Sequence, residues 1–252
     1  MALALAEAGA RTVYCVDLPK TPSQEWAKVS EFAKRLPVEG SGQTPRGGDP
    51  EARLKYVSAD VRDQEAMWRV GKTIGDREGR MDACVAAAGT LAPEEMSCLT
   101  YSAKMFQEVL DVNVNGTLFT AQAAGQQMER FGSGGSIVML ASVSGHAANK
   151  GYAWTAYNTS KSAVLQMARS MACELGPKGI RVNSISPGAI KTPMIARFIS
   201  TAEAEKAWAE QHPLGRVGRP DELRGVAVWL ASDASSFCTG SDFFVSGGYH
   251  AW

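Results

Sequence analysis

Short apolar runs alternate with longer helical stretches along nearly the whole chain, and this alternation limits the folds that the chain can adopt. The apolar runs end at turn residues or acids, which is typical of strands buried on both faces of a sheet. These runs are 12–16, 54–58, 83–86, 136–140, 181–185 and 242–245. Helical patterns lie between them, at about 23–36, 63–75, 102–131, 155–175 and 220–231. This order predicts right-handed βαβ units and an α/β fold with a doubly wound parallel sheet.

The chain is predicted to fold as one domain. Its 252 residues, 45% of them hydrophobic, can bury a sizeable core. The segment 37–50 is rich in glycine and is followed by a strand of the same sheet, so it is predicted to be a flexible surface insertion and not a domain linker. Gly176-Pro177 is predicted to end the fourth helix, with Gly just past the last turn. We therefore expect a single domain over 1–252.

Charge and composition exclude several classes of partner. Lys+Arg and Asp+Glu both total 26 and no basic stripe is present, so nothing favours nucleic acid or an anionic membrane. The sequence shows no apolar stretch of about 18 residues and no charged-then-apolar start, so it predicts neither a transmembrane helix nor a secretory signal. The five cysteines are odd in number and scattered, which favours a reducing compartment, and the three histidines lack metal-site spacing. These features predict a cytoplasmic protein without a catalytic metal that acts on a small molecule.

Tyr157 and Lys161 stand four residues apart within one predicted helix, and Ser142 stands just beyond an apolar strand. Residues i and i+4 share one helix face, so the phenol and the ammonium are expected to converge. A free phenol has a pKa near 10, and its use as an acid or base near neutral pH requires roughly 4 kcal/mol of phenolate stabilisation. A cation in a desolvated site supplies much of that free energy. The three residues predict proton-transfer chemistry, but chance also produces this spacing, so other motifs must decide.

Further motifs accompany these three residues, and together they resemble the short-chain dehydrogenase/reductase family of nicotinamide-dependent oxidoreductases. The matching segments are Asn113-Val-Asn-Gly116, Ser142-Val-Ser-Gly145, Tyr157-Asn-Thr-Ser-Lys161 and Ser186-Pro-Gly-Ala-Ile-Lys-Thr192. The resemblance covers nearly the whole chain. It implies a Rossmann-like fold and hydride transfer between a nicotinamide cofactor and a secondary alcohol or ketone. The cofactor is expected to be NAD, with NADP as the alternative. The ending Tyr249-His-Ala-Trp252 resembles the family's fungal sugar and polyol reductases.

One family segment is missing. Members of the family begin with a strand and a T-G-x-x-x-G-x-G turn that holds the cofactor pyrophosphate, and this sequence contains neither. The absent strand would be central, between the strands that end near Asp17 and Gly89, so its loss is expected to leave two unpaired edges. Either the sequence begins downstream of the true start, or the chain is a variant with impaired cofactor binding. Two functions therefore stay open: an active dehydrogenase, and a redox-inactive binding or scaffold protein derived from the family.

The cofactor is expected at the carboxyl edge of the sheet. An acid at the end of the first visible strand accepts hydrogen bonds from ribose hydroxyls and repels a 2′-phosphate, which favours NAD over NADP. The alternative for this acid is a turn Asp without a ligand. The other contacts follow from the resemblance, which implies an adenine site, a backbone contact, and a segment that closes over the nicotinamide. The predicted cofactor-binding residues are Asp17, Leu18, Asp60, Val61, Gly89, Tyr157, Lys161, Pro187, Gly188, Ile190 and Thr192.

The resemblance also implies the catalytic roles. Tyr157 gives or takes the proton, Ser142 hydrogen-bonds the substrate oxygen, and Lys161 lowers the phenol pKa and binds the nicotinamide ribose. Asn113 is expected to hold a water that extends the proton relay, with local bonding to the backbone as the alternative. Ser144 stands thirteen residues before Tyr157, a spacing common in the family, but Ser142 begins the Ser-x-x-Gly pattern and is preferred.

The substrate pocket is expected between the loop around His146, Tyr152 and Trp154 and a lid at 193–219. The mixed polar and aromatic wall favours a small polyol, a ketose or a cyclic ketone. For His146, a surface or hydrogen-bonded structural role is the favoured alternative to lining this pocket. By resemblance we expect a homo-oligomer, a tetramer or dimer built through the helices at 102–131 and 155–175.

Overall fold

The computed structural model describes residues 1–36, 53–92 and 96–252, so the predicted insertion at 37–50 lies outside the described residues. Every predicted strand is present, and every paired strand is parallel to its neighbour. The strands are β1 (Val13–Asp17), β2 (Leu54–Ser58), β3 (Ala83–Ala86), β4 (Gly135–Leu140), β5 (Ile180–Pro187) and β6 (Asp242–Val245). The α/β prediction is therefore confirmed strand by strand.

The strands form two separate sheets, with order β1-β2 in one and β3-β4-β5-β6 in the other. Among the described residues, β1 pairs with β2 alone and β3 pairs with β4 alone. The predicted break between the strands that precede Asp17 and Gly89 is thus present. The backbone groups along these two facing edges take no part in a strand ladder.

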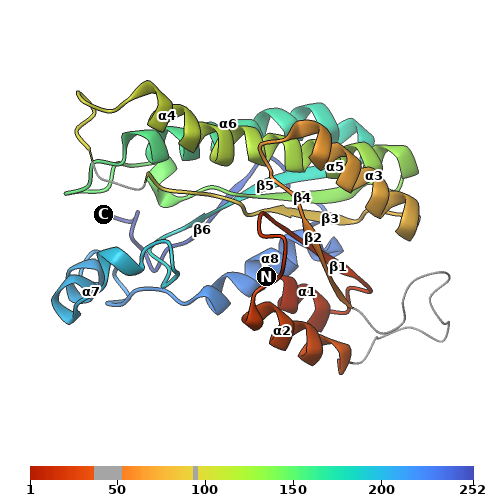
Figure 1. Ribbon diagram of the computed structural model, residues 1–252, viewed down its shortest axis with the longest axis horizontal. Coiled ribbons are helices and arrows are strands. Elements are labelled where there is room, and N and C mark those ends of the chain that lie inside the picture. Colours follow the sequence, from red (N-terminus) through yellow and green to blue (C-terminus); the bar gives the residue numbers. More distant parts are fainter. Residues whose placement is uncertain (37–52, 93–95) are drawn as a thin grey trace.

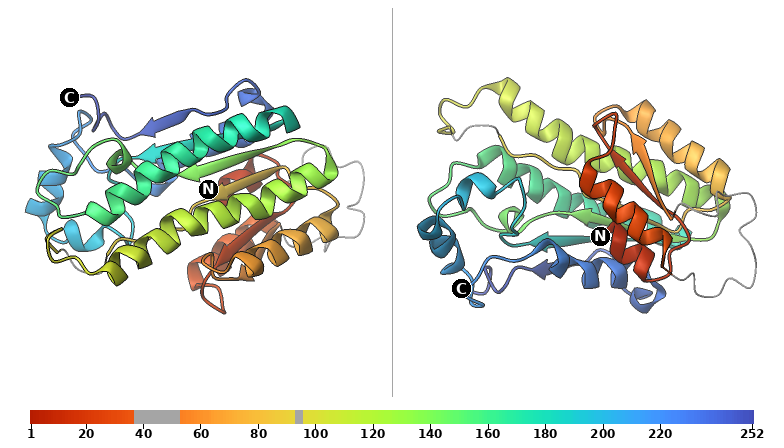
Figure 2. Two further views of the ribbon diagram at one scale, coloured as in Figure 1. Left: turned by 90° about the horizontal axis from the view of Figure 1, so that it is seen from above. Right: turned by 60° about the horizontal axis from the view of Figure 1, so that its bottom comes forward.

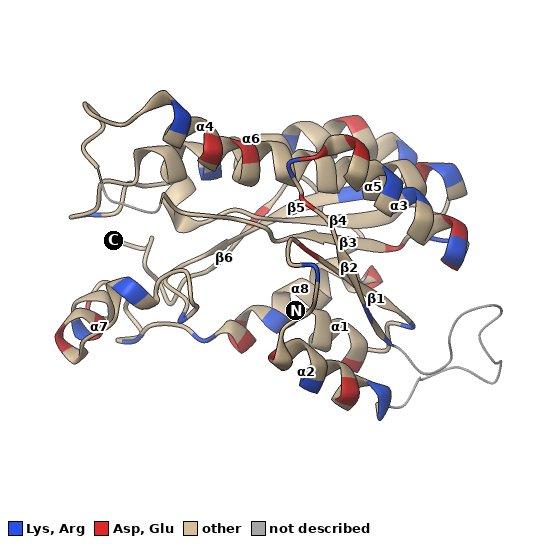
Figure 3. Cartoon of the chain, viewed as in Figure 1, with Lys and Arg blue, Asp and Glu red and all other residues tan. Residues whose placement is uncertain are grey.

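Helices cover both faces of the four-stranded sheet, as Figures 1 and 2 show. α3, α4, α5 and α6 lie on one face, whereas α1, α2 and α8 lie on the other, and α7 lies beyond the ends of the strands. Charges of both signs are interspersed on α2, α3 and α7 (Figure 3). The helices are α1 (Ala2–Glu7), α2 (Gln24–Lys34), α3 (Gln64–Glu78), α4 (Ala103–Leu110), α5 (Gly116–Phe131), α6 (Thr155–Leu175), α7 (Ala202–Ala209) and α8 (Arg224–Ala231).

Short helical turns modify three of the predicted helices. The predicted helix 102–131 is divided by the π-helical turn η1 (Asp111–Asn115), and the predicted helix 220–231 begins with a 3-10 turn. The predicted stop at Gly176-Pro177 is confirmed, because α6 ends at Leu175 and Gly176 is its C-cap residue. Gly176 is not left-handed, however: its φ is −54°, and the chain continues through a 3-10 turn to Gly179, whose φ is +72°. Proline is tolerated in the first turn of a helical segment, so the left-handed stop moves to the next glycine. The 3-10 turns are η2 (Val143–Gly145), η3 (Gly176–Lys178), η4 (Ala196–Phe198), η5 (Pro220–Leu223) and η6 (Asp233–Ser235).

Apolar packing fixes the layers. The strands β4 and β5 are buried along almost their entire length, and their side chains pack against α5 and α6 on one face and α8 on the other. Gly71 of α3 lets this helix approach α5, because a Cβ at position 71 would collide with the carbonyl of Ala123. The core therefore holds the carboxyl ends of β3, β4 and β5 as a rigid platform.

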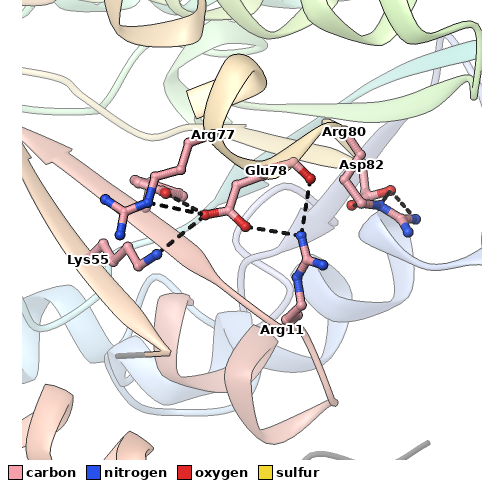
Figure 4. A network of polar contacts seen from close by, with 7 residues as sticks. Arg11, Lys55, Arg77, Glu78, Arg80 and Asp82 are labelled. Carbon is pink, nitrogen blue, oxygen red and sulfur yellow. Dashed lines mark hydrogen bonds and ion pairs between the residues drawn. The ribbon is translucent and has the colours of Figure 1, made fainter. Parts of the chain in front are cut away.

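Polar contacts join the two-stranded sheet to the rest of the domain (Figure 4). Glu78, at the end of α3, accepts hydrogen bonds from Tyr14 of β1 at 2.6 Å and from Lys55 of β2 at 3.3 Å, and it pairs with Arg11 at 3.0 Å. Burial alone would raise the pKa of Glu78, but the Tyr14 hydrogen bond and the positive charges outweigh it and leave the pKa below its usual value. A further ion pair, Arg224 with Glu7, joins α8 to α1. Side chains thus bridge the break that the backbone leaves.

Candidate active site

Two of the predicted catalytic hydroxyls meet at the carboxyl end of β4. Ser142 follows β4 and caps η2, where its Oγ accepts a hydrogen bond from the backbone N–H of Ser144 at 3.1 Å. The hydroxyl of Tyr157, in the first turn of α6, lies near enough to Ser142 for the serine hydroxyl to act on the pKa of the phenol. Lys161 lies one turn further along α6, with its Nζ 5.7 Å from the centre of the Tyr157 ring. The structure therefore brings together Ser142, Tyr157 and Lys161.

Lys161 is buried at 4% exposure, and its Nζ donates a hydrogen bond to the carbonyl of Leu140 at 2.7 Å. Burial lowers the pKa of this ammonium to about 8. The bond to Leu140 uses one of three N–H donors. Gly89 lies next to the ammonium, because a Cβ at position 89 would be 3.5 Å from Nζ. The side chain therefore retains donor capacity on the side where Gly89 leaves room.

The pKa of Tyr157 differs from the expectation. Burial raises the pKa of Tyr157 above the usual value of 10.0, and the nearby Ser142 hydroxyl opposes that effect without cancelling it. Lys161 was expected to lower this pKa, but its ammonium is held at the Leu140 carbonyl and is itself destabilised by burial. The Tyr157 side chain is consequently protonated throughout the neutral pH range in this structure.

Asn113 connects three elements around this site. It lies in the π-helical turn η1 and is fully buried. Its side-chain amide contacts both backbone groups of Thr90, accepting from the N–H at 2.7 Å and donating to the carbonyl at 3.0 Å, and it donates to Ser160 Oγ at 2.9 Å. The alternative of local bonding does not describe this side chain, because its partners are 23 and 47 residues away. Asn113 therefore fixes the loop after β3 against α6, beside Gly89 and Lys161.

The two serines of the Ser-x-x-Gly segment have different partners. Ser144 Oγ donates to Asn149 Oδ1 at 2.8 Å, and Asn149 in turn donates to the hydroxyl of Tyr249 at 3.2 Å. Ser142 faces Tyr157, whereas Ser144 holds the loop that follows. Gly145 lies against α6, because a Cβ there would be 2.8 Å from the carbonyl carbon of Lys161. Sequence reasoning missed Asn149, Thr90 and the Leu140 carbonyl, since no spacing along the chain indicates them.

His146 has the structural role that was weighed as its alternative. Its Nε2 lies 2.8 Å from Asp242 Oδ2, and its ring packs against Phe244 with centroids 4.6 Å apart. Asp242 also accepts a hydrogen bond from Ser184 at 2.6 Å. These contacts join the loop after β4 to the edge strand β6.

The predicted cofactor residues lie at the carboxyl ends of β1, β2, β3 and β5. Asp17 is exposed at the end of β1, where one carboxylate oxygen accepts from the Leu18 N–H at 2.8 Å. Asp60 is bound on both oxygens by the guanidinium of Arg62, and this hydrogen bonding lowers the pKa of Asp60. An adenine group would therefore compete with Arg62 for this carboxylate.

The remaining predicted contacts are positioned by packing. Val61 contacts the start of α5, because a Cβ at Gly116 would be 2.6 Å from Val61 Cγ2. Gly188 lies against the backbone of Ser246 at a distance that leaves no room for a side chain. Pro187 ends β5, while Ile190 is buried in an isolated bridge with Gly218 and Thr192 is partly exposed. An exposed acid after β1, a side-chain-free position after β3 and an ammonium with unused donors fit a nicotinamide dinucleotide laid along this edge.

The segment predicted as a lid lies close to the loop before α6. It contains η4 and α7, and Trp208 of α7 is 3% exposed. Trp208 stacks on Tyr152 with ring centroids 5.0 Å apart.

Other site types find no support in the described part of the chain. Within residues 1–36, 53–92 and 96–252, no three His, Cys, Asp or Glu side chains gather as a metal site. None of the helices in those ranges combines the length and apolar character needed to cross a bilayer. All five cysteines are free thiols.

The fold, with Ser142, Tyr157 and Lys161 together at the carboxyl edge of its sheet, is that of an α/β oxidoreductase. A family model described as "Enoyl-(Acyl carrier protein) reductase" matches residues 1–250. The chain belongs to the short-chain dehydrogenase/reductase family. The predicted family, fold and class of activity, hydride transfer between NAD or NADP and an alcohol or ketone, are confirmed.

Named relatives give this family membership more detail. The chain is 43% identical over 198 residues to the sorbose reductase sou1 of Schizosaccharomyces pombe, covering 78% of this chain and 76% of the relative. It is 38% identical over 195 residues to the NADP-dependent mannitol dehydrogenase of Hypocrea jecorina, covering 77% of this chain and 70% of the relative. A crystal structure of a short-chain type dehydrogenase/reductase from Mycobacterium marinum superposes with a TM-score of 0.83 at 36% identity, covering 98% of this chain and 89% of that chain.

Proposed function

We propose that this protein interconverts a small ketose and the corresponding polyol, with Tyr157 as the group that exchanges the proton. The observation that carries the proposal is the juxtaposition of Tyr157 and Ser142, with the buried ammonium of Lys161 5.7 Å from the centre of the Tyr157 ring. Sorbose reductase and mannitol dehydrogenase among the relatives support the substrate class.

Each side chain has one task in the proposed reaction. When bound, the nicotinamide cofactor supplies or accepts the hydride. In the reductive direction, the Tyr157 phenol donates its proton to the ketone oxygen, and Ser142 Oγ donates a hydrogen bond to the same oxygen while negative charge develops on it. In the oxidative direction, the phenolate removes the hydroxyl proton. Asn113 is a positioning residue, because it holds the Thr90 loop and α6 in register.

The Lys161 ammonium stabilises the phenolate when that charge forms. Taken from Nζ to the ring centre at 5.7 Å, and with an effective dielectric constant of about 20, the attraction is about 3 kcal/mol. In this structure burial outweighs these effects and leaves the pKa of Tyr157 above its usual value.

The exposed carboxylate of Asp17 at the end of β1 supports NAD as the cofactor, because a second negative charge on a 2′-phosphate would be repelled there. NADP is the second candidate, since the mannitol dehydrogenase among the relatives is NADP-dependent. Asp60 contributes to the adenine site only where Arg62 releases it.

Three broader features belong to the proposal. Residues 193–219 act as a lid that opens and closes over the substrate, supported by the packing of α7 against the loop before α6. The protein forms a homo-oligomer, a tetramer or dimer, through α4, α5 and α6, whose outer surfaces lie along one side of the molecule (Figure 2). It works in the cytoplasm, in keeping with its free thiols.

Titration of the chain with NADH and NADPH, followed by turnover of a ketose, tests the proposal. We expect saturable cofactor binding and turnover that falls a hundredfold or more in Tyr157→Phe, since acid–base catalysis contributes about 10² to 10⁴. Tyr14→Phe is the matched control, because that hydroxyl bonds Glu78 and not the site. Unchanged turnover in Tyr157→Phe refutes the mechanism. Absence of saturable binding in the unmodified chain would instead support the redox-inactive scaffold, which the break between β1 and β3 favours.

A further inference from the structure

Four aromatic side chains gather where the lid meets the loop before α6. Tyr152 and Trp154 come from the loop, and Phe198 and Trp208 come from η4 and α7. Tyr152 and Trp154 each stack on Trp208, with ring centroids 5.0 and 6.0 Å apart. The Phe198 ring meets those of Tyr152 and Trp154 edge to face, with centroids 5.5 and 5.1 Å apart. We call Tyr152, Trp154, Phe198 and Trp208 the lid aromatic cluster.

The lid aromatic cluster borders the proton-exchanging phenol. Trp154 is the N-cap residue of α6, three residues before Tyr157. Its ring meets that of Tyr157 edge to face, with centroids 6.1 Å apart and planes at 76°. A substrate with its reacting carbon at Tyr157 would therefore place its next carbons near the Trp154 indole.

Polar atoms in and beside this cluster are buried without partners. The indole Nε1 of Trp154 and that of Trp208 are both buried, and among the described residues neither donates a hydrogen bond. Indole N–H groups usually find an acceptor when buried, and an unmet donor costs about 1–3 kcal/mol. Two unmet donors in one cluster therefore indicate an acceptor that comes from outside the chain.

His212 adds a buried hydrogen-bond acceptor beside the lid aromatic cluster. It is 3% exposed, and its ring lies 5.2 Å from that of Tyr249. Its Nδ1 lies 2.7 Å from the carbonyl of Trp208, which only accepts, so Nδ1 carries the proton. Burial lowers the pKa of His212, so the ring is neutral and the unpartnered Nε2 is a hydrogen-bond acceptor.

We propose that Trp154, together with Trp208 and His212, is the specificity site for the hydroxyl-bearing carbon chain of a neutral polyol or ketose. The indole N–H groups donate to hydroxyl oxygens, and His212 Nε2 accepts from a hydroxyl. Hydroxyl groups both donate and accept, whereas a plain cyclic ketone or alcohol would leave these atoms unmet. The indole N–H groups are covered, so α7 shifts to admit the ligand. This inference rests on the proposed function, because it assumes that the reacting carbon lies at Tyr157.

Binding measurements test the proposed specificity site separately from turnover. The probes are a hexitol and cyclohexanol, titrated by calorimetry into the full chain with cofactor present. Trp154→Phe keeps an aromatic ring at this position and removes the indole N–H, and we expect it to weaken hexitol binding about tenfold and to leave cyclohexanol binding unchanged. Trp229→Phe is the matched control, because its indole donates to the carbonyl of Ala234 in η6, the 3-10 turn after α8.

The outcomes distinguish the two proposals. Equal weakening of both probes in Trp154→Phe, or no binding of hexitol by the unmodified chain, overturns the specificity site. Selective weakening without any turnover of the hexitol overturns the proposed reaction and supports the specificity site. A measurement on the unmodified chain guards against a variant that fails to fold: deoxyhexitols that each lack one hydroxyl are expected to include at least one that binds about tenfold more weakly than the hexitol. Equal affinity across that series overturns the inference.

Discussion

The buried ammonium of Lys161 gives the sharpest test of the site, because burial has a measurable effect on stability. The pKa of Lys161 in the folded chain is about 8, against 10.5 for an ordinary lysine. The unfolded chain therefore binds this proton more tightly than the folded chain. Folding stability falls as pH decreases through the window between these two values, and is unaffected by this group above it.

The size of the effect follows from that shift. A difference of about 2.5 pKa units corresponds to about 3 kcal/mol at neutral pH, at about 1.4 kcal/mol per unit. At about pH 10 most of this penalty has gone, so the free energy of unfolding gains about 2.5 kcal/mol between about pH 7 and pH 10 from this group. Lys161→Met removes the charge and with it this pH dependence. It also removes the hydrogen bond to Leu140, but that loss is the same at every pH.

Urea denaturation of the unmodified chain and of Lys161→Met, from about pH 7 to pH 10, measures how the free energy of unfolding of each depends on pH. We expect Lys161→Met to lose activity, and the stability of the unmodified chain to rise relative to the variant by about 2.5 kcal/mol across this range. Lys178→Met is the matched control, because Lys178 is exposed and pairs with Glu129. Parallel pH profiles for the unmodified chain and Lys161→Met would refute the reasoning, since they would mean that the ammonium is not desolvated.

Three other substitutions test the packing and the cofactor site. Glu78→Gln is expected to cost about 2 kcal/mol near neutral pH, because it removes a carboxylate that is 9% exposed and forms ion pairs with three cations. Since folding lowers the Glu78 pKa, this loss of stability should shrink as pH falls below the ordinary value of 4.5, and a pH-independent loss in denaturation would contradict the prediction. Gly145→Ala is expected to cost about 1–3 kcal/mol in thermal unfolding, because the new methyl group collides with the backbone of Lys161. Gly176→Ala is the matched control, because the space around that position is open. Equal melting temperatures for the two variants would contradict the contact. Asp17→Ser is expected to raise the ratio of NADPH to NADH affinity about tenfold, since it removes the carboxylate that repels a 2′-phosphate, and an unchanged ratio in fluorescence titrations would exclude this role.

The sequence determined the order of the strands and helices, and much of the catalytic set. Buried parallel strands are continuous apolar runs, so β4 and β5 stand out without any knowledge of their partners. The spacing of Tyr157 and Lys161 fixes their shared helix face by local geometry alone. The break between β1 and β3 also followed from the sequence, because the segment that would fill it is not there.

Tertiary structure decided the partners of each polar group. Nothing along the chain indicates that Asn113 bonds Thr90, that Ser144 holds Asn149, or that the Lys161 ammonium rests on the Leu140 carbonyl. These bonds join residues whose separation in sequence carries no periodic signal, and they form only once the layers have packed. The direction of the Tyr157 and Lys161 pKa shifts has the same origin, because desolvation depends on the whole surrounding core and not on neighbours in the sequence.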